Sequence, residues 1–446
     1  MKKLAVLFLL IYVSTNYGDD LPRRAFIGIQ PVEINDSNKV AYSIDNGVLA
    51  ARVIPGSSAE IIGLKAGDIL LSIGEEKITS PAQFLALTSN YKGGDEIEIY
   101  SVKGGEKSVD KIRLVEFPRE NPEGFDVVYD HVMVRGNRLR TITMKPDKKG
   151  KQPAILFIQG VGAYSVDFPF PTSHPYRELV YKLAEKGFVV MRAEKSGMGD
   201  SEGPRASEIG FNLESEGFLQ ALKKLKTYDF VDTSNVFIFG HSMGGVIGPV
   251  VISEESVKGI AVYGTLTSNW MEYEYFMDRS QMTLAGTDPD SIRKAIMDRA
   301  LFSYHFYLQH ETPLEIIGKF PQLEDFYSVN IPDSIHIYGI HHSYIYEIYE
   351  HNLSRFWKIA NTNVAAIYGL SDFVAPKYDH IMIADIVNQY HPGKGRLIFI
   401  ENADHAFKNT TDTRQSLQFW GTPQGIFNDA VIDSTVDWLN NLINVN

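Results

Sequence analysis

The chain has 446 residues, of which 44% are hydrophobic and 12% aromatic, a composition typical of a globular protein with room for more than one domain. Its formal net charge of −12, with no offsetting run of basic residues, argues against nucleic acid as a partner. The sequence contains no cysteine, which excludes a disulfide framework and a lipid-anchoring cysteine.

Residues 1–18 are predicted to be a signal peptide. Lys2 and Lys3 give a positive start, residues 4–13 form an unbroken apolar segment, and cleavage is expected after Thr15 or Gly18. A segment of this length is about half the roughly 20 residues that a membrane-spanning helix needs. The alternative is a buried first helix. We therefore expect an exported protein, periplasmic or secreted, without stable insertion in a membrane.

Residues 24–116 are predicted to form a small β-rich domain. Its expected elements are strands at 26–29, 47–54 and 96–102, a hairpin at 73–78 and a helix at 81–89. Between them, residues 57–71 read SSAEIIGLKAGDILL, which places a short helix and two turns before another strand. The pattern S-A-x-x-x-G-L-x-x-G-D in this run resembles a PDZ domain of the bacterial, circularly permuted kind.

The PDZ resemblance implies a groove that binds a peptide C-terminus. By this resemblance, the carboxylate-binding loop and the strand that a peptide extends consist of Phe26, Ile27, Gly28 and Ile29, opposite helix 81–89. The alternatives are that the groove holds a segment of the same chain or nothing, because a fold does not guarantee a ligand.

Residues 117–124, FPRENPEG, are predicted to be a linker because two prolines and several charges mark a domain boundary. On this interpretation the first domain is separable. Its removal up to about Phe117 is then expected to leave hydrolysis of small esters nearly unchanged.

From residue 125 to residue 446, strands and helices alternate, which predicts a mostly parallel sheet covered on both faces. The segment begins with a hairpin around residues 135–137. The strands expected after it are 154–158, 188–193, 236–239, 259–262, 364–368 and 396–400, and the main helices are 176–186, 213–226 and 427–442.

Residues 240–244 read Gly-His-Ser-Met-Gly, the G-x-S-x-G pattern of a nucleophile elbow. An apolar strand precedes the pattern and a helix of small residues follows it, so Ser242 is expected on a tight strand-to-helix turn. The helix that starts at Met243 directs its N-terminal amides at the reaction centre. Pro249 lies inside this helix and is expected to kink it or end it early. The pattern in this context predicts a serine hydrolase.

The order of elements and motifs resembles the α/β-hydrolase fold, and within it bacterial esterases that carry a run similar to FVVMRAEKSGMGDSEG at residues 188–203. We interpret the glycine-rich part of this run as a structural turn. In this fold the catalytic residues follow the chain order Ser, Asp or Glu, His. Asp372 follows strand 364–368 and His405 follows strand 396–400, so the predicted triad is Ser242, Asp372 and His405. Asp404 is the competitor for the acid.

The resemblance also implies an oxyanion hole made by two backbone amides. One belongs to Met243, and the other to Val161 in the turn at residues 159–162. This turn reads Gln-Gly where the family often has His-Gly, a change of side chain that leaves backbone donors in place. No metal or organic cofactor is implied.

Residues 265–355 are too long for a loop and rich in aromatic side chains, which predicts a helical cap over the site. The alternative is that these rings only fill the core between cap and sheet. Glu272 and Glu274 are candidates to hold a substrate amine, as in exopeptidases of this fold, against the alternative of a solvated helix face.

The sequence as a whole predicts an exported serine hydrolase, a carboxylic ester hydrolase that forms an acyl-enzyme with a small-molecule ester. Two alternatives remain open. One is a serine exopeptidase of the same fold, and the other is a peptide-binding scaffold whose hydrolase domain is not catalytic.

Overall fold

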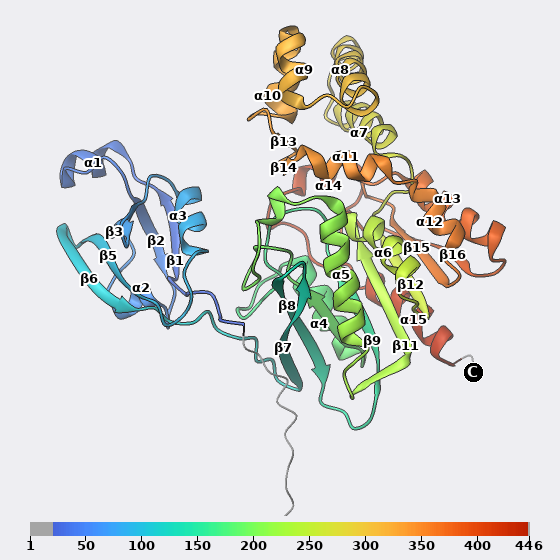
Figure 1. The fold of residues 1–446 in the computed structure, drawn as a ribbon, viewed down its shortest axis with the longest axis horizontal. Helices are drawn as coiled ribbons and strands as arrows, with labels where there is room; N and C mark the ends of the chain where they lie inside the picture. Colours follow the sequence, from blue (N-terminus) through green and yellow to red (C-terminus); the bar gives the residue numbers. More distant parts are fainter. Residues whose placement is uncertain (1–20, 445–446) are drawn as a thin grey trace, which may run out of the picture.

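The computed structural model describes residues 21–444, which form two folded units, each with its own sheet and core (Figure 1). The predicted signal peptide at residues 1–18 lies outside the described residues. Among the helices of residues 21–444, none combines the length and the apolar character that crossing a membrane requires.

The N-terminal unit is an antiparallel sheet with three short helices. In order across the sheet, the strands are β1 (Ile29–Glu33), β2 (Val48–Val53), β3 (Ile69–Ile73), β5 (Glu96–Lys103) and β6 (Glu106–Arg113), and β4 (Glu76–Lys77) pairs with β3. The helices are α1 (Asp36–Tyr42), α2 (Ser58–Ile61) and α3 (Pro81–Thr88). The sequence analysis did not predict α1 or β6. Helix α1 buries no residue, and β6 alternates charged and partly buried residues at the sheet edge, so neither has a strong apolar pattern.

The predicted strand at residues 26–29 is mostly a loop. Strand β1 begins only at Ile29. The carbonyl groups of Phe26 and Ile27 accept hydrogen bonds from the amides of Ser58 and Ala59, at the start of α2. The three residues before Ile29 are therefore tied to α2, and they do not pair as a strand.

The C-terminal unit is built on a mixed sheet of eight strands within the described residues. In order across it they are β16 (Gly395–Ile400), β15 (Asn363–Gly369), β12 (Gly259–Tyr263), β11 (Val231–His241), β9 (Gln152–Ile158), β10 (Val189–Ala193), β8 (Asn137–Pro146) and β7 (Phe125–Val134). From β16 to β10 all neighbours are parallel, and β8 and β7 add an antiparallel edge. This arrangement places the carboxyl ends of the parallel strands, and the loops that follow them, at one edge.

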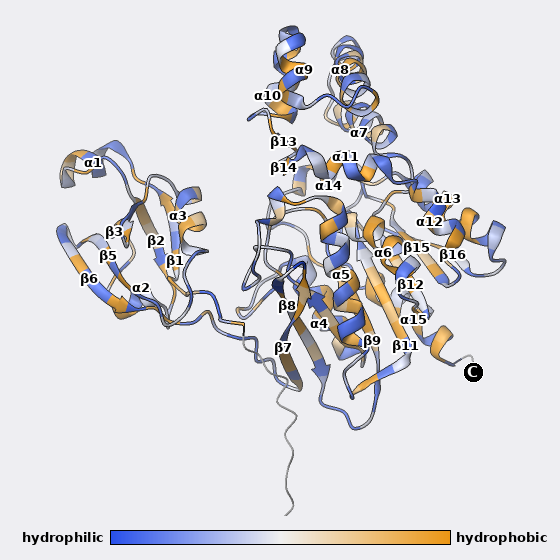
Figure 2. Ribbon diagram, viewed as in Figure 1, coloured by the Kyte–Doolittle hydropathy of each residue, from blue (hydrophilic) through white to orange (hydrophobic). Residues whose placement is uncertain are grey.

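Helices cover both faces of this sheet. One core lies between the sheet and α5 (Phe211–Leu225), α6 (Met243–Glu254) and α13 (Lys377–Tyr390), and a second lies between the sheet and α4 (Pro175–Glu185) and α15 (Ala430–Asn444). Figure 2 shows that hydrophobic residues gather on the strands and on the inner sides of these helices. Of the two effects expected of Pro249, the early end does not occur: helix α6 continues to Glu254, and apolar residues on both sides of the proline are buried.

The predicted cap at residues 265–355 is a group of helices above the carboxyl ends of the strands (Figure 1). It contains α7 (Trp270–Leu284), α8 (Pro289–Ser303), α9 (Pro313–Lys319), α10 (Glu324–Asn330) and α11 (His342–Glu350), with the short hairpin β13 (His336–Ile337) and β14 (Ile340–His341). The remaining α-helices are α12 (Leu353–Ile359), which comes just before α13 in the chain order of helices, and α14 (Thr413–Phe419), which comes after β16.

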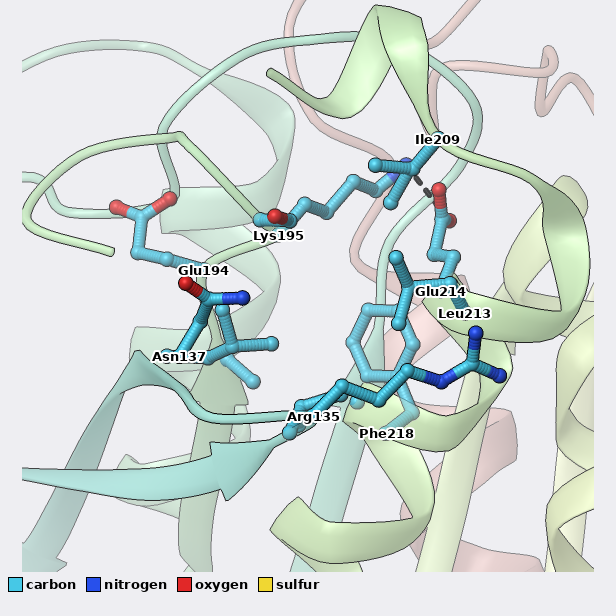
Figure 3. Close-up of a pocket in the computed structure, with 13 residues that line it drawn as sticks. Arg135, Asn137, Glu194, Lys195, Ile209, Leu213, Glu214 and Phe218 are labelled. Carbon is cyan, nitrogen blue, oxygen red and sulfur yellow. Dashed lines mark ion pairs between the residues drawn. The ribbon is translucent and has the colours of Figure 1, made fainter. Parts of the chain in front are cut away.

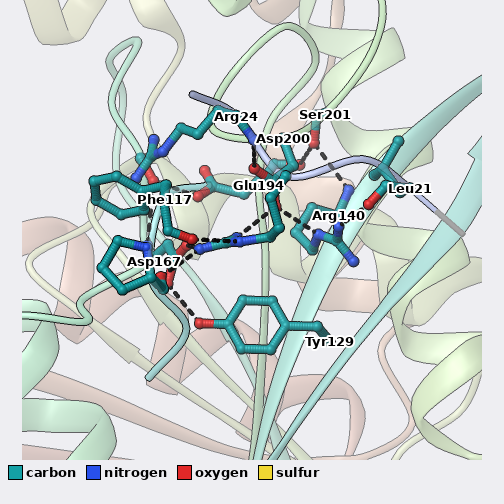
Figure 4. A network of polar contacts seen from close by, with 12 residues as sticks. Leu21, Arg24, Phe117, Tyr129, Arg140, Asp167, Glu194, Asp200 and Ser201 are labelled. Carbon is teal, nitrogen blue, oxygen red and sulfur yellow. Dashed lines mark hydrogen bonds and ion pairs between the residues drawn. The ribbon is translucent and has the colours of Figure 1, made fainter. Parts of the chain in front are cut away.

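The N-terminal segment, residues 21–24, precedes the first sheet in sequence but packs into the C-terminal unit (Figure 4). The guanidinium of Arg23 is buried and pairs with the carboxylates of Asp167 at 2.9 Å and Asp200 at 2.5 Å. The carbonyl of Leu21 accepts a hydrogen bond of 2.7 Å from the Arg140 guanidinium. Burial lowers the pKa of the Arg23 guanidinium, whereas the carboxylates of Asp167 and Asp200 raise it. The net result is a pKa above the ordinary value.

The predicted linker at residues 117–124 is also part of the C-terminal unit. The carboxylate of Glu120 is buried, pairs with the Arg192 guanidinium, and accepts hydrogen bonds from the Phe168 amide and the Tyr181 hydroxyl. The segment is therefore anchored to the C-terminal unit, because the negative charge of Glu120 is paired with the buried Arg192 guanidinium and not exposed to solvent. The prolines and charges predicted a linker between domains, and the structure shows that residue Glu120 of this segment is bonded to the C-terminal unit.

Three aromatic rings join the two units. Phe26 lies 5.5 Å, between ring centroids, from both Phe117 and Phe170, and the latter two are 5.8 Å apart. Phe170 belongs to the loop between β9 and α4, which also carries Asp167. A truncation up to Phe117 would remove Arg23 together with the first sheet, so we do not expect this particular truncation to leave the C-terminal unit unaffected.

Candidate active site

Ser242 occupies the turn between β11 and α6, with backbone angles φ 53° and ψ −120° that are strained for a residue with a side chain. The backbones around it approach very closely. A Cβ atom on Gly240 would lie 2.4 Å from the Gly244 carbonyl oxygen, and one on Gly244 would lie 2.0 Å from the Ile158 carbonyl oxygen. Both glycines of the G-x-S-x-G pattern are thus required by contact, and the turn they permit presents Ser242 to a cavity.

Asp372 and His405 lie on the loops after β15 and β16. The Asp372 carboxylate is 2.8 Å from His405 Nδ1, and its other oxygen accepts hydrogen bonds from the amides of Val374 and Ala375 at 2.7 and 2.9 Å. A carboxylate can only accept from the imidazole, so Nδ1 carries the proton and Nε2 is left as the basic nitrogen. Ser242 and His405 line the same cavity.

Asp404, the competing candidate for the acid, has other partners. One of its carboxylate oxygens accepts hydrogen bonds from the amides of Ala406 at 2.9 Å and Lys408 at 2.8 Å, which shapes the turn that carries His405. Burial raises the pKa of Asp404 above its ordinary value. The structure thus places Asp372, not Asp404, against His405 Nδ1.

Gly264 is a residue of this site that the sequence analysis missed. It follows β12 and has φ +60°, and a Cβ atom there would lie 2.9 Å from His405 Nδ1 and 3.0 Å from the Asp372 carboxylate. Its signal in the sequence was weak, a single glycine after a strand of the same sheet. Only a glycine leaves room for the imidazole and carboxylate to meet.

The two residues predicted to supply the oxyanion donors line the same cavity. Met243 is the first residue of α6, a position at which a helical amide has no partner within the helix. Val161 follows Gly160 in the loop after β9, and both residues line the cavity with Ser242. The Gly160 amide donates to the Tyr176 hydroxyl at 3.0 Å and is therefore occupied.

The cavity has a volume of about 710 Å³ and a mainly apolar and aromatic wall. Helix α7 of the cap contributes one face, with Trp270, Tyr273, Met277 and Gln281 spaced three or four residues apart along the helix. Other apolar wall residues are Leu266, Ile340, Ile345, Phe373, Leu417 and Trp420. Among the described residues that line the cavity there is no aspartate, glutamate, lysine or arginine.

The cap aromatics divide between the two interpretations given for them. Trp270 and Tyr273 line the cavity, as expected for a cap that shapes a substrate site. Phe306 and Tyr307 are buried in the core that the cap shares with the sheet, as expected for simple packing.

Glu272 and Glu274 do not face the cavity, which contradicts their candidacy as an amine site. The Glu272 carboxylate accepts the Asn269 amide at 2.9 Å and caps α7. Glu274 is fully buried, pairs with Arg299 at 3.3 Å and accepts the Tyr307 hydroxyl at 2.8 Å. A sequence pattern cannot show that Arg299, on the next helix, already neutralises Glu274.

The glycine-rich turn at residues 194–201 supports the loop that carries Val161. Lys195 donates to the Gly160 carbonyl at 2.8 Å and pairs with Glu214 at 2.9 Å, beside a small cavity (Figure 3). Glu194 accepts hydrogen bonds from the Ser165 hydroxyl and the Val166 amide, and burial raises its pKa to about 7. These contacts agree with the interpretation of the turn as structural.

Of the predicted peptide-binding residues, Ile29 begins the edge strand of the first sheet, and Phe26, Ile27 and Gly28 form the loop before it. Strand β1, which starts at Ile29, is the edge strand, and α3 packs near it. Gly28 has φ +76°, and a Cβ atom there would lie 2.1 Å from the Ser57 side chain, so this position requires glycine. Phe26 is turned to the contact with Phe117 and Phe170, while peptide binding itself stays a prediction. In the described part of the chain, no cluster of three or more metal-ligating side chains occurs.

Comparisons with known proteins match both units. The family described as serine aminopeptidase, S33, matches residues 171–286, and the PDZ domain family matches residues 49–98. Esterase EstD of Thermotoga maritima is 26% identical over 117 residues, covering 26% of this chain and 28% of the esterase. A probable periplasmic serine protease do/HhoA-like of Haemophilus influenzae is 33% identical over 94 residues, covering 21% of this chain and 20% of the protease.

The chain therefore spans less than a third of the length of the curated relatives it matches. Among solved structures, Est1E from Butyrivibrio proteoclasticus with bound ferulic acid aligns with a TM-score of 0.45 and 13% identity, covering 71% of this chain and 99% of Est1E. The family matches and the sheet order confirm the fold class, an α/β-hydrolase fold preceded by a PDZ domain.

Proposed function

We propose that the protein is an exported serine esterase that hydrolyses uncharged carboxylic esters. The observation that carries this proposal is the arrangement of Ser242, His405 and Asp372 at a cavity whose described wall holds no charged carboxylate, ammonium or guanidinium group. Export is proposed from the predicted signal peptide and from the similarity of the first domain to proteins described as periplasmic.

The proposed reaction proceeds through an acyl-enzyme. Ser242 Oγ attacks the ester carbonyl carbon while His405 Nε2 takes its proton, and the amides of Met243 and Val161 stabilise the oxyanion. As the carbon–oxygen bond breaks, His405 returns the proton to the leaving alcohol. Water then attacks the acyl group by the same route, which releases the acid and restores Ser242. Asp372 holds the imidazole tautomer throughout.

An exopeptidase is the second candidate, and the site disfavours it. An exopeptidase must bind the charged terminus of its substrate, and a buried charge without a partner is costly. The two glutamates that could have served, Glu272 and Glu274, are engaged elsewhere. A neutral ester with an apolar or aromatic acyl group meets the wall described above at no such cost.

The PDZ domain is proposed to bind a peptide C-terminus along β1. The carboxylate would be held near Gly28, where the backbone turns before the edge strand, and the peptide would add a strand to the sheet. This partner belongs to the same proposal as the esterase activity, although the two sites are chemically independent.

The test is hydrolysis of short-chain and aromatic p-nitrophenyl esters by the purified full chain, with aminoacyl and dipeptidyl anilides in parallel. We expect ester hydrolysis and little anilide cleavage, and a loss on the order of 10⁶-fold in kcat for Ser242→Ala. More than a few per cent of residual activity in Ser242→Ala would remove Ser242 from the nucleophile role. Anilide cleavage as efficient as the best ester would favour the exopeptidase.

A further inference from the structure

His241 is a buried imidazole next to the nucleophile, and the reaction described above does not use it. It stands between Gly240 and Ser242 at the end of β11. Its ring centroid lies 4.8 Å from that of His405 and 5.3 Å from that of Tyr176. The side chain therefore packs, from within the elbow, against the loop that carries His405 and against α4.

The hydrogen bonds of His241 allow one tautomer only. Its Nε2 lies 2.8 Å from the backbone carbonyl oxygen of His405, and a carbonyl oxygen can only accept, so Nε2 carries the proton. Its Nδ1, 2.7 Å from the Tyr176 hydroxyl, must then accept the hydroxyl proton. The elbow is thereby linked to the loop that carries His405 on one side and to α4 on the other.

Tyr176 extends this link to the loop that carries Val161. Its hydroxyl oxygen accepts the Gly160 amide at 3.0 Å while its proton goes to His241. A Cβ atom on Gly160 would lie 3.1 Å from Ser242 Cβ, so this loop lies directly against the nucleophile. With the Gly160 amide occupied, the next amide along the chain is that of Val161.

We propose that Tyr176 and His241 are positioning residues, which fix the Val161 loop, Ser242 and the His405 loop at the relative positions that catalysis requires. This proposal rests on the proposed esterase function. The hydrogen bonds of Tyr176 and His241 join three segments that are far apart in sequence, at Gly160, His241 and His405. The nearest two, Gly160 and His241, are separated by 81 positions. Their relative placement therefore depends on tertiary contacts, and a displacement of about 1 Å in an active site can cost about 100-fold in rate.

The hydrogen bonds that join the Gly160 amide, Tyr176, His241 and the His405 carbonyl are together called the relay. The relay requires a neutral His241. Burial lowers the pKa of His241 well below its ordinary value of 6.5, and a protonated His405 beside it lowers the pKa further. The other titratable residues beside His241 are Tyr176 and Tyr263, whose rings lie near the imidazole, and burial raises the pKa of both hydroxyls. A protonated His241 would have two donors, and the Tyr176 hydroxyl would lose its acceptor.

Tyr176→Phe removes one hydroxyl and keeps the ring. We expect kcat for the best ester to fall about 10- to 100-fold with KM changed less than about twofold, because the oxyanion donor and the base are misplaced while the cavity wall is intact. The matched control is Tyr228→Phe, which deletes another buried hydroxyl, one bonded to Asp130 at 3.3 Å and not in the cavity wall. Equal kcat values for the two variants would overturn the proposal.

Two substitutions of His241 separate the halves of the relay. His241→Gln keeps a donor near Nε2 for the His405 carbonyl, and His241→Asn keeps an acceptor near Nδ1 for Tyr176. We expect each to retain more kcat than His241→Leu, which keeps neither. A purely structural role predicts instead that all three lower the thermal midpoint without changing kcat of the folded fraction.

A measurement without turnover keeps the relay testable if no ester is hydrolysed. In ¹⁵N spectra of the full chain, His241, assigned by comparison with His241→Gln, should show the neutral Nε2–H tautomer from about pH 6 to pH 8. Its signal should shift in Tyr176→Phe and not in Tyr228→Phe. That pattern in an inactive protein would refute the proposed function and keep the relay, whereas a titrating or Nδ1-protonated His241 would refute the relay itself.

Discussion

Arg23→Ala tests whether the N-terminal segment is part of the hydrolase domain. The substitution removes the only cationic group of residues 21–24 that pairs with both Asp167 and Asp200, and it leaves these carboxylates buried. Removing one partner of a buried ion pair typically costs about 3–5 kcal/mol. Because Asp200 keeps a second bond to Arg140 at 3.0 Å, we expect the lower end of this range, about 3 kcal/mol.

The cost should depend on pH in a defined direction. Burial, opposed by Arg23, raises the pKa of Asp167 above its ordinary value, and without Arg23 that pKa rises further. The folded variant then binds more protons than the unfolded chain, so its stability falls as the pH rises. The deficit of Arg23→Ala relative to the wild type is therefore largest above the folded pKa of Asp167 in the variant and shrinks as the pH falls through that pKa.

Urea unfolding followed by tryptophan fluorescence measures this, because the 4 tryptophans of the chain all lie in the C-terminal unit. The control is Arg135→Ala, which breaks an ion pair with Glu216 in which the Arg135 side chain is 62% exposed. Exposed pairs contribute about 0.2–1 kcal/mol at most. A cost for Arg23→Ala no greater than that of the control, or a cost that grows on acidification, would refute the reasoning.

Three further outcomes follow from the site and the domain junction. Asp372→Asn should lower kcat for ester hydrolysis by about 10⁴-fold, and Asp404→Asn should lower it far less, because only Asp372 contacts His405 Nδ1. Comparable losses in the two variants would refute the assignment of Asp372 as the acid. Replacing residues 26–115 by a short glycine-rich turn should preserve folding and turnover, because Ala25 and Glu116 are bridge partners and their backbones already lie side by side. Truncation to Phe117 should instead yield little soluble protein, because it removes Arg23. Equal yields would show that residues 21–24 are dispensable. Gly264→Ala should reduce kcat strongly, and the control Gly286→Ala should not. Both glycines have positive φ, but only a Cβ atom at position 264 would contact His405 and Asp372. Similar rates in the two variants would mean that the loop with Gly264 can shift to make room for the new methyl group.

The sequence predicted the parts of the site that follow from local pattern and strand order. The spacing of Gly240 and Gly244 predicted the turn at Ser242, and parallel strands bring the loops with Asp372 and His405 to one edge. The roles of these residues remain predictions, but the structure gathers their side chains around one cavity.

What the sequence could not show depends on contacts between distant segments. Nothing near Arg23 or Glu120 in sequence indicates Asp200 or Arg192 as partners, and a charged, proline-rich stretch gives the same local pattern whether it is anchored or free. The Glu274 carboxylate reads as solvated until Arg299 is placed beside it. Pro249 reads as a helix terminator because local preference omits the burial that overrides it.

The separation along the chain of Arg23 and Asp200, 177 positions, has a kinetic consequence. Contacts between such distant residues carry a loop-closure cost, and we expect this one to form late, after the sheet has brought Asp167 and Asp200 together. An interaction that is absent from the folding transition state acts on the rate of unfolding and barely on the rate of folding. We therefore expect the contacts of residues 21–24 to slow the unfolding of the C-terminal unit and to leave its folding rate nearly unchanged.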